Sequence, residues 1–160
     1  AAKRGPTIVT FNQVISAAAQ SGRFKDAAAW FRKMKSASIA PNTIAYNTLM
    51  DAAAKRGKLD IAERLCKEMR ALQLEPTANT FRTLLNAASK AGRLQDGERW
   101  LAIMIAEGFT PGVVEYTSLI NGAMGRGDIQ AAEGYYDMII AAKAKPDVFV
   151  FSALLAVAAK

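Results

Sequence analysis

Small polar side chains recur at two positions of the sequence. One position follows an aromatic residue, and its occupants are Asn12, Asn47, Arg82, Thr117 and Ser152. The other follows a proline, and its occupants are Asn42, Thr77, Gly112 and Asp147. Amides, hydroxyls and carboxylates are groups that hydrogen-bond the Watson–Crick edge of an unpaired base. Base recognition is therefore the chemistry that most of these residues suggest.

Helix capping offers a structural explanation for part of the pattern. Asn, Thr and Asp are preferred N-cap residues, so capping competes with base recognition at Asn42, Thr77 and Asp147, and one side chain can do both. Asn12, Asn47 and Thr117 are expected inside helices, where capping explains them less well.

The two positions belong to a repeat of 35 residues. Three residue classes mark the period: Pro6, Pro41, Pro76, Pro111 and Pro146; Gly22, Gly57, Gly92 and Gly127; and Phe11, Tyr46, Phe81, Tyr116 and Phe151. A constant period of this length indicates an array of identical supersecondary units. The expected units are residues 8–42, 43–77, 78–112 and 113–147, preceded by the tail of an earlier unit at 1–7 and followed by one helix at 148–160.

Each unit is expected to contain two helices. In the second unit, apolar residues follow a helical period from Ile44 to Lys55 and again from Leu59 to Leu72, and Gly57 separates the two runs. Small residues share one position of the second helices, which predicts close approach there: Ala27, Ala62, Gly97 and Ala132.

Stacking is needed to bury the apolar side of such helices, since none can bury it alone. The sequence therefore predicts an all-α solenoid of helix-turn-helix repeats with one continuous core. The last helix is expected to expose Phe149, Phe151 and Leu155, together with Leu154, which predicts contact with a missing repeat, a second copy or another protein.

The composition bounds the function. The net charge of +7 suggests a polyanionic partner, nucleic acid before a membrane surface, although a soluble protein can also simply be basic. No apolar run is long enough for a membrane span. The single Cys66 excludes an internal disulfide and a cysteine-based metal site, and we expect it to be a small buried apolar residue.

Residues for catalysis are missing from the pattern. The chain has no His, no glycine-rich phosphate loop and no carboxylate pair that repeats on one face. Asp60, Glu63 and Glu98 are expected to be solvated helix surface. We therefore expect no enzyme activity, no cofactor and no metal.

The unit resembles the pentatricopeptide repeat (PPR). The residues that carry this resemblance are P-N-T-I-A-Y-N-T-L-M, which begins at Pro41, and R-G-K-L-D-I-A-E-R-L-C-K-E-M, which begins at Arg56. It covers about residues 8–160 in five copies that keep the same phase. The tetratricopeptide repeat, with 34 residues and a different motif, does not fit.

The resemblance implies a right-handed superhelix that binds single-stranded RNA, one base per repeat. It assigns base selection to the two polar positions. Asn12 with Asn42 is then similar to a cytosine reader, Asn47 with Thr77 to a weaker pyrimidine reader, and Thr117 with Asp147 to a guanine reader, while Ser152 suggests a purine. Arg82 with Gly112 departs from the family pattern, so the third repeat either reads no base or contacts the RNA backbone.

Two further sets of residues take roles from the resemblance. Apolar residues just before the reading position would sandwich each base, namely Val9, Ile44, Val114 and Phe149, with Asn79 departing in the third repeat. Packing between repeats explains these residues equally well. Lysines near the end of the first helices, Lys55, Lys90 and Lys160, would contact phosphates, although a cation there also suits the helix macrodipole.

The resemblance also implies a mitochondrial or chloroplast protein that acts in processing, stability or translation of transcripts. Two other classes stay open. One is a protein-binding scaffold within an organellar ribosome or transcription complex. The other is an enzyme whose catalytic domain lies elsewhere in a longer chain and for which the repeats bind RNA.

Overall fold

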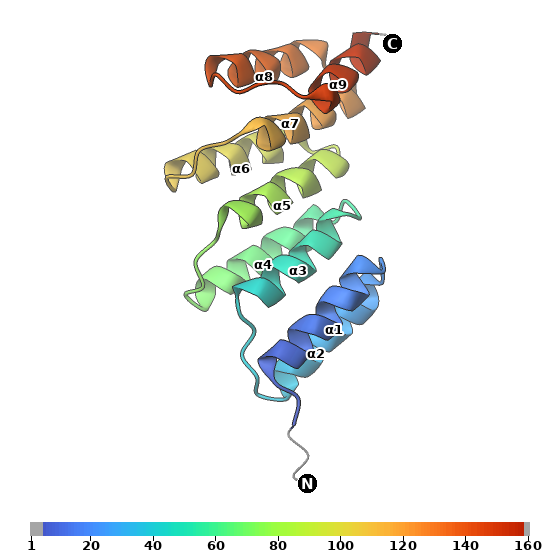
Figure 1. Cartoon of the computed structure of the whole chain (residues 1–160), viewed down its shortest axis with the longest axis vertical. Helices are drawn as coiled ribbons and strands as arrows, with labels where there is room; N and C mark the ends of the chain where they lie inside the picture. Colours follow the sequence, from blue (N-terminus) through green and yellow to red (C-terminus); the bar gives the residue numbers. More distant parts are fainter. Residues whose placement is uncertain (1–4, 159–160) are drawn as a thin grey trace.

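The computed structural model describes residues 5–158, and over this range it consists of nine helices without strands. They are α1 (Ile8–Gln20), α2 (Phe24–Ser36), α3 (Thr43–Ala54), α4 (Leu59–Ala71), α5 (Ala78–Lys90), α6 (Leu94–Ala106), α7 (Val113–Arg126), α8 (Ile129–Ala141) and α9 (Val148–Ala158). The predicted all-α solenoid is confirmed, and the units stack from the N-terminus to the C-terminus in one direction (Figure 1).

The sequence sets the ends of these helices locally. Asn42 is the N-cap of α3, and its Oδ1 accepts the backbone N–H of Ala45 at 3.1 Å, so this helix begins at Thr43. Gly57 lies in the turn between α3 and α4 and has a φ of 63°. A Cβ at this glycine would lie 3.2 Å from the carbonyl oxygen of Lys90 in the next unit, so the glycine also permits close packing of the turns.

The helices form two layers that differ in how they contact each other. Each first helix packs on the next one, in the order α1, α3, α5, α7 and α9. A second helix packs on its own first helix and on the first helix of the next unit, and over the described residues the backbones of two second helices do not approach each other closely. We call the layer of first helices the inner layer, because these helices approach each other more closely than the second helices do.

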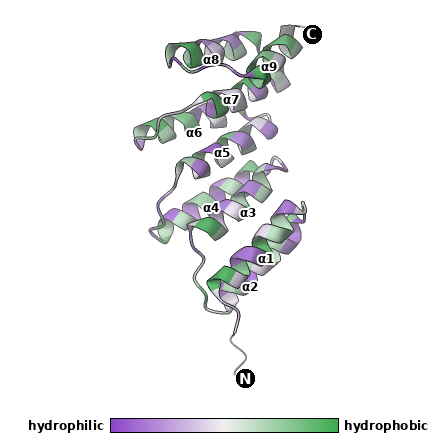
Figure 2. Ribbon diagram, viewed as in Figure 1, coloured by the Kyte–Doolittle hydropathy of each residue, from purple (hydrophilic) through white to green (hydrophobic). Residues whose placement is uncertain are grey.

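The core runs continuously between the layers, so most of the helices carry an apolar and a polar side (Figure 2), whereas α9 is apolar along nearly its whole length. Phe31 and Tyr46 join the first two units, with ring centroids 5.0 Å apart. The predicted close approach is present, because Ala27, Ala62 and Ala132 are fully buried. At the same position a Cβ on Gly97 would come within 2.7 Å of Leu119 Cδ2, and glycine avoids this contact.

Polar contacts connect the second helices to each other. The expectation that Glu63 is solvated was wrong, because its side chain is only 16% exposed and accepts hydrogen bonds from Trp100 Nε1 at 2.8 Å and from Arg99. Glu98, although exposed, accepts a hydrogen bond from the hydroxyl of Tyr135. Asp60 does keep an 87% exposed side chain and pairs with Arg93 at 2.6 Å.

The last helix, α9, exposes Phe149, Phe151 and Leu155 as predicted, and also Val148. The prediction was wrong for Leu154, which is half-buried because it packs against the core. Its Phe151 ring contacts Tyr136 of α8 at a centroid distance of 6.1 Å. Over the described residues, no helix combines the length and apolarity that crossing a bilayer requires.

Candidate nucleic-acid interface

The two polar positions of the repeat come together in space. Asn12 Nδ2 lies 3.3 Å from Asn42 Oδ1, and Asn47 Nδ2 lies 3.4 Å from Thr77 Oγ1. The members of each pair are 30 residues apart and belong to successive first helices, one within the helix and one at the N-terminus of the next. The pairs therefore form polar sites at the first two junctions of the inner layer.

Two hollows lie along this layer next to the polar pairs. The first has a volume of about 480 Å³ and is lined by Val9, Asn12 and Ile44, among others. The second has a volume of about 470 Å³ and is lined by Ile44, Asn47 and Asn79, with Asp51 and Lys55 further along. Both have the size of a ligand pocket, and in each a polar reading residue lies between the side chains at two successive sandwich positions.

The four apolar residues predicted to sandwich bases are exposed. Relative exposure is 60% for Val9, 61% for Ile44, 50% for Val114 and 70% for Phe149. Packing between repeats, the alternative explanation, would bury them. Their exposure leaves apolar faces at regular intervals on the inner layer. Asn79, also exposed, gives the second hollow one polar wall.

The second site contains a further hydrogen bond that the sequence pattern did not predict. Thr80 Oγ1 donates to Asn47 Oδ1 at 2.8 Å and lies 3.3 Å from Thr77 Oγ1, while the backbone N–H of Thr77 donates to Thr80 Oγ1 at 3.0 Å. At the first site, Ala45 occupies the position that corresponds to Thr80. Asn12 Oδ1 is buried there without a hydrogen-bond partner.

An ion pair closes the third site. Arg82 Nε donates to Glu115 Oε1 at 3.0 Å, and Glu115, whose side chain is 3% exposed, also accepts the backbone N–H of Gly112 at 2.9 Å. The departure of Arg82 and Gly112 from the repeat pattern thus has a physical counterpart. The charge of the arginine is compensated inside the protein.

The fourth and fifth reading residues bond to their own helices. Thr117 Oγ1 donates to the Val113 carbonyl at 2.6 Å, and Ser152 Oγ donates to the Val148 carbonyl at 2.7 Å. Asp147 Oδ1 accepts the backbone N–H groups of Phe149 and Val150, both at 3.0 Å. Capping and the reading position therefore coincide at Asp147, as they do at Asn42.

The lysines lie at the far end of the first helices. Lys55 lines the second hollow, and its Nζ pairs with Asp51 at 2.7 Å. Lys90 Nζ donates to the Lys55 carbonyl at 3.4 Å, which places both cations on one edge of the array. Lys160, the third predicted phosphate contact, lies outside the described residues.

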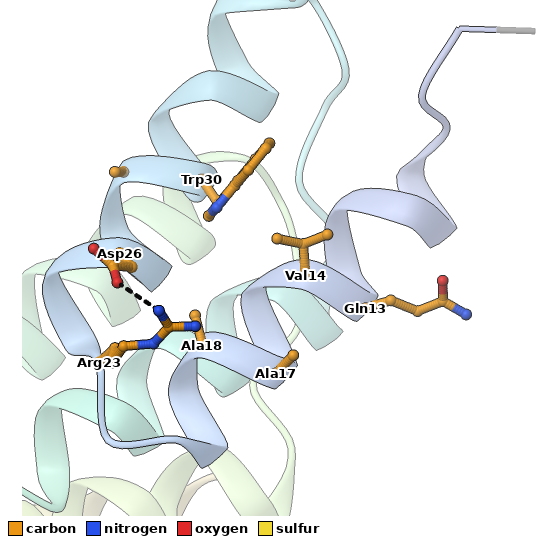
Figure 3. A pocket seen from close by; sticks show the side chains of 8 residues that line it. Gln13, Val14, Ala17, Ala18, Arg23, Asp26 and Trp30 are labelled. Atoms are coloured by element: carbon orange, nitrogen blue, oxygen red, sulfur yellow. Dashed lines mark ion pairs between the residues drawn. The ribbon is translucent and has the colours of Figure 1, made fainter.

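A separate apolar hollow of about 370 Å³ lies between α1 and α2 (Figure 3). Its lining includes Val14, Trp30 and the ion pair of Arg23 with Asp26, at 3.6 Å. Arg23 and Trp30 occupy the repeat positions of Arg93 and Trp100, which in the third unit contact Asp60 and Glu63 of the second. This surface corresponds to a stacking surface and not to the polar pairs of the inner layer.

Potential metal ligands do not cluster, since the described residues contain no group of three or more His, Cys, Asp or Glu side chains able to hold an ion. Cys66 is buried as predicted, and burial raises the pKa of its thiol.

Family models match nearly the whole chain. The model of the PPR repeat family matches residues 6–46 and 41–90, the PPR repeat model matches residues 79–109, and the pentatricopeptide repeat domain model matches residues 101–160. No curated protein sequence matches the chain significantly.

Solved structures share the fold. The PPR protein PPR10 from maize is 25% identical, with a TM-score of 0.82 over 96% of this chain, and PPR10 in complex with an 18-nt psaJ RNA element is 26% identical, with a TM-score of 0.84 over 97%. This chain spans 22–23% of PPR10. The PPR domain of Arabidopsis thaliana protein-only RNase P 1, solved with tRNA, is 18% identical, with a TM-score of 0.80, and the match covers 97% of this chain and 81% of that domain.

Proposed function

Because the chain belongs to the pentatricopeptide repeat family, we propose that it binds single-stranded RNA along its inner layer, one base per repeat. The observation that carries the proposal is the pairing of the two polar positions at successive junctions, Asn12 with Asn42 and Asn47 with Thr77, beside hollows walled by exposed apolar residues. The RNA-bound structure of PPR10, which has the same fold over 97% of this chain, supports the same conclusion.

The base order follows from the site chemistry together with the family pattern. At the fourth site, the hydroxyl of Thr117 already donates a hydrogen bond to the backbone carbonyl of Val113. Thr117 and Asp147 therefore offer only acceptors towards the groove. Guanine presents two neighbouring donors on its Watson–Crick edge and suits this site. Asn12 with Asn42 is assigned cytosine and Asn47 with Thr77 a pyrimidine. The third site, which the ion pair closes, selects no base. The proposed order of bases is therefore cytosine, pyrimidine, any base, guanine and, at Ser152, a purine.

Binding to short RNAs tests this assignment. The chain is titrated with single-stranded RNAs whose cores are C-C-N-G, C-U-N-G or scrambled, at low and at moderate salt. Stacking contributes about 1–3 kcal/mol per base, while association costs about 4–15 kcal/mol, so affinity is expected to be modest. The matched cores should bind more tightly than the scrambled core at both salt concentrations.

Thr117→Asn provides the residue-level control. Its amide should move the preference at the fourth base from guanine towards uracil and leave the preference at the first base unchanged. If all RNAs bind equally and binding disappears at moderate salt, only the net positive charge acts, and one-base reading is wrong. If no RNA binds at either salt concentration, RNA binding by this array is wrong.

We also propose that the array acts by binding and not by catalysis, in a mitochondrion or chloroplast. A protein scaffold is the second candidate function, because Val148, Phe149 and Leu155 form an exposed apolar surface on α9 that suits a protein contact. Failure of every RNA to bind, together with retained folding, would favour the scaffold.

A further inference from the structure

The positive charge of the first two units lies mainly outside the inner layer. The first helix α1 contains no charged residue, and α3 contains only Asp51, which pairs with Lys55. The second helix α2, by contrast, carries four basic residues and a single carboxylate, Asp26. The proposed reading sites of the inner layer therefore do not account for the basic character of this half of the chain.

Four basic residues of the second helices α2 and α4 form an exposed surface that we call the outer basic face: Lys25, Arg32, Arg64 and Lys67. Lys25 and Arg32 are close to two full turns apart, so they share one side of α2. Arg64 and Lys67 are neighbours on the corresponding side of α4. The buried residues of both helices lie on the opposite side. Over the described residues, none of the four cations takes part in an ion pair.

The two halves of the outer basic face are neighbours, because Lys35 of α2 pairs with Glu68 of α4. One repeat position contributes to both halves, and its charge changes along the array. The occupants in the four units, all of them exposed, are Arg32, Lys67, Ala102 and Asp137. Folding of the repeat thus requires no cation at this position, so the cations of the first two units are available to a ligand.

The side chains between the cations are small or polar. The outward line of α2 is Lys25, Ala29, Arg32 and Ser36, and that of α4 is Asp60, Arg64, Lys67 and Ala71. Single-stranded nucleic acid stacks its bases on aromatic side chains, and a membrane surface takes up large apolar side chains, and neither kind is present in these two lines. A duplex keeps its bases inside and presents phosphates and 2′-hydroxyl groups, so double-stranded RNA is the polyanion that suits this face.

We propose that the outer basic face is a second RNA-binding site, which binds the phosphate backbone of a duplex without reading its sequence. It belongs to the layer of second helices, whereas the proposed reading sites belong to the inner layer, so one RNA can occupy both. A hairpin stem next to the unpaired segment supplies such a duplex. The cations act as point charges towards phosphates, which carry no sequence information.

A blunt RNA duplex of about 16 base pairs, which offers no unpaired base, is the probe. Its dissociation constant is measured between about 50 and 200 mM salt, where the logarithm of affinity falls linearly with the logarithm of the salt concentration. The double variant Arg32→Ala with Lys67→Ala should bind more weakly and reduce the steepness of this line by about two, because each lost phosphate contact reduces it by about one. Thermal unfolding of the variant should match that of the unmodified chain, since both side chains are exposed.

A second double variant controls for net charge. Lys143→Ala with Lys145→Ala removes two exposed cations from the segment after α8 and lowers the net charge equally. It should leave the salt dependence of duplex binding nearly unchanged. An equal reduction in both double variants would show that only net charge acts and would overturn the inference, as would failure of the unmodified chain to bind the duplex at the lower salt concentration.

Anionic lipid is the other polyanion to test. The chain is sedimented with vesicles of phosphatidylcholine and phosphatidylserine, and little of it should bind. Sedimentation that Arg32→Ala with Lys67→Ala abolishes, together with no binding of the duplex, would assign the outer basic face to a membrane surface and overturn the inference.

The two RNA sites are separated by testing each variant on both ligands. Arg32→Ala with Lys67→Ala should keep the preference for the single-stranded C-C-N-G core over the scrambled core, and Thr117→Asn should leave duplex binding unchanged. Competition between the duplex and the short C-C-N-G strand would show a single shared site and overturn the inference. Duplex binding that Arg32→Ala with Lys67→Ala weakens, combined with no preference among single strands, would contradict only the proposed function.

Discussion

Arg82 and Glu115 form an ion pair across the junction between the third and fourth units, with Arg82 Nε 3.0 Å from Glu115 Oε1. The carboxylate is almost fully buried and also receives the backbone N–H of Gly112, whereas the arginine is about half exposed. One side chain therefore caps α7 and holds the residue at the reading position of the preceding repeat.

Replacing Glu115 should destabilise the array. Glu115→Ala leaves the Gly112 N–H without its cap and Arg82 without its partner, so the free energy of unfolding should fall by about 1–3 kcal/mol. Glu115→Gln keeps an acceptor for Gly112 and should cost less. Chemical denaturation of both variants measures the difference, and equal losses would show that the cap does not contribute.

Substitution of Glu63 should destabilise the fold more than substitution of its neighbour Asp60. Glu63→Ala leaves the indole N–H of the buried Trp100 unpaired and should lower the free energy of unfolding by about 1–3 kcal/mol. Asp60→Ala removes an exposed pair with Arg93, which solvent screens, so its effect should be smaller. The order of the two denaturation midpoints tests this, and a larger loss for Asp60→Ala would contradict it.

Two glycines with the same backbone conformation should respond differently to substitution by Ala. Gly57 and Gly92 have φ angles of 63° and 66°, so both substitutions incur the left-handed strain of about 1–2 kcal/mol. Only the Cβ at residue 57 meets a neighbouring carbonyl, at 3.2 Å, while that at residue 92 meets no atom within 4 Å. Thermal unfolding should therefore show a lower midpoint for Gly57→Ala than for Gly92→Ala.

Removing one buried hydroxyl should increase stability. The hydroxyl of Tyr46 is fully buried without a hydrogen-bond partner, and phenylalanine occupies the same repeat position at Phe11 and Phe81. Tyr46→Phe should raise the free energy of unfolding by about 1 kcal/mol, because the hydroxyl loses its hydrogen bonds to water on folding and gains none in the protein. Tyr135→Phe is the matched control and should instead lower it, since that hydroxyl donates to Glu98. Destabilisation by Tyr46→Phe would show that the hydroxyl of Tyr46 makes a favourable contact in the folded chain.

Alkaline pH should weaken the fold through Tyr135. Burial, followed by the hydrogen bond to Glu98, raises the pKa of Tyr135 well above its ordinary value near 10. Above the ordinary pKa, the Tyr135 hydroxyl loses its proton in the unfolded chain but keeps it in the folded chain, so stability falls as the pH rises. Denaturation between about pH 9 and 11 should show this fall, and Tyr135→Phe should reduce it. The raised pKa of the buried Tyr46 leaves a residual slope.

The period in the sequence was sufficient to predict the fold and the inner layer. Pro41 and Gly57 bound the helices locally, and small residues such as Ala62 mark close packing, so these features repeat with the sequence. The contacts of Thr80 and Glu115 could not be predicted in this way, because the residue type at their position is not constant from unit to unit and each partner lies 33 residues away. Glu63 was misjudged for the same reason, since Trp100 belongs to another unit.

The contact of Thr80 with Asn47 has a consequence for protein engineering. A cassette cut at the repeat boundary, residues 43–77, carries Asn47 and Thr77 but leaves Thr80 behind, so its hydrogen bonding depends on the host sequence that follows. A cassette extended through Thr80 keeps all three partners. Recombination sites placed just after Thr80 therefore transplant all three contacting residues together, whereas sites placed at the prolines divide them between parent and host.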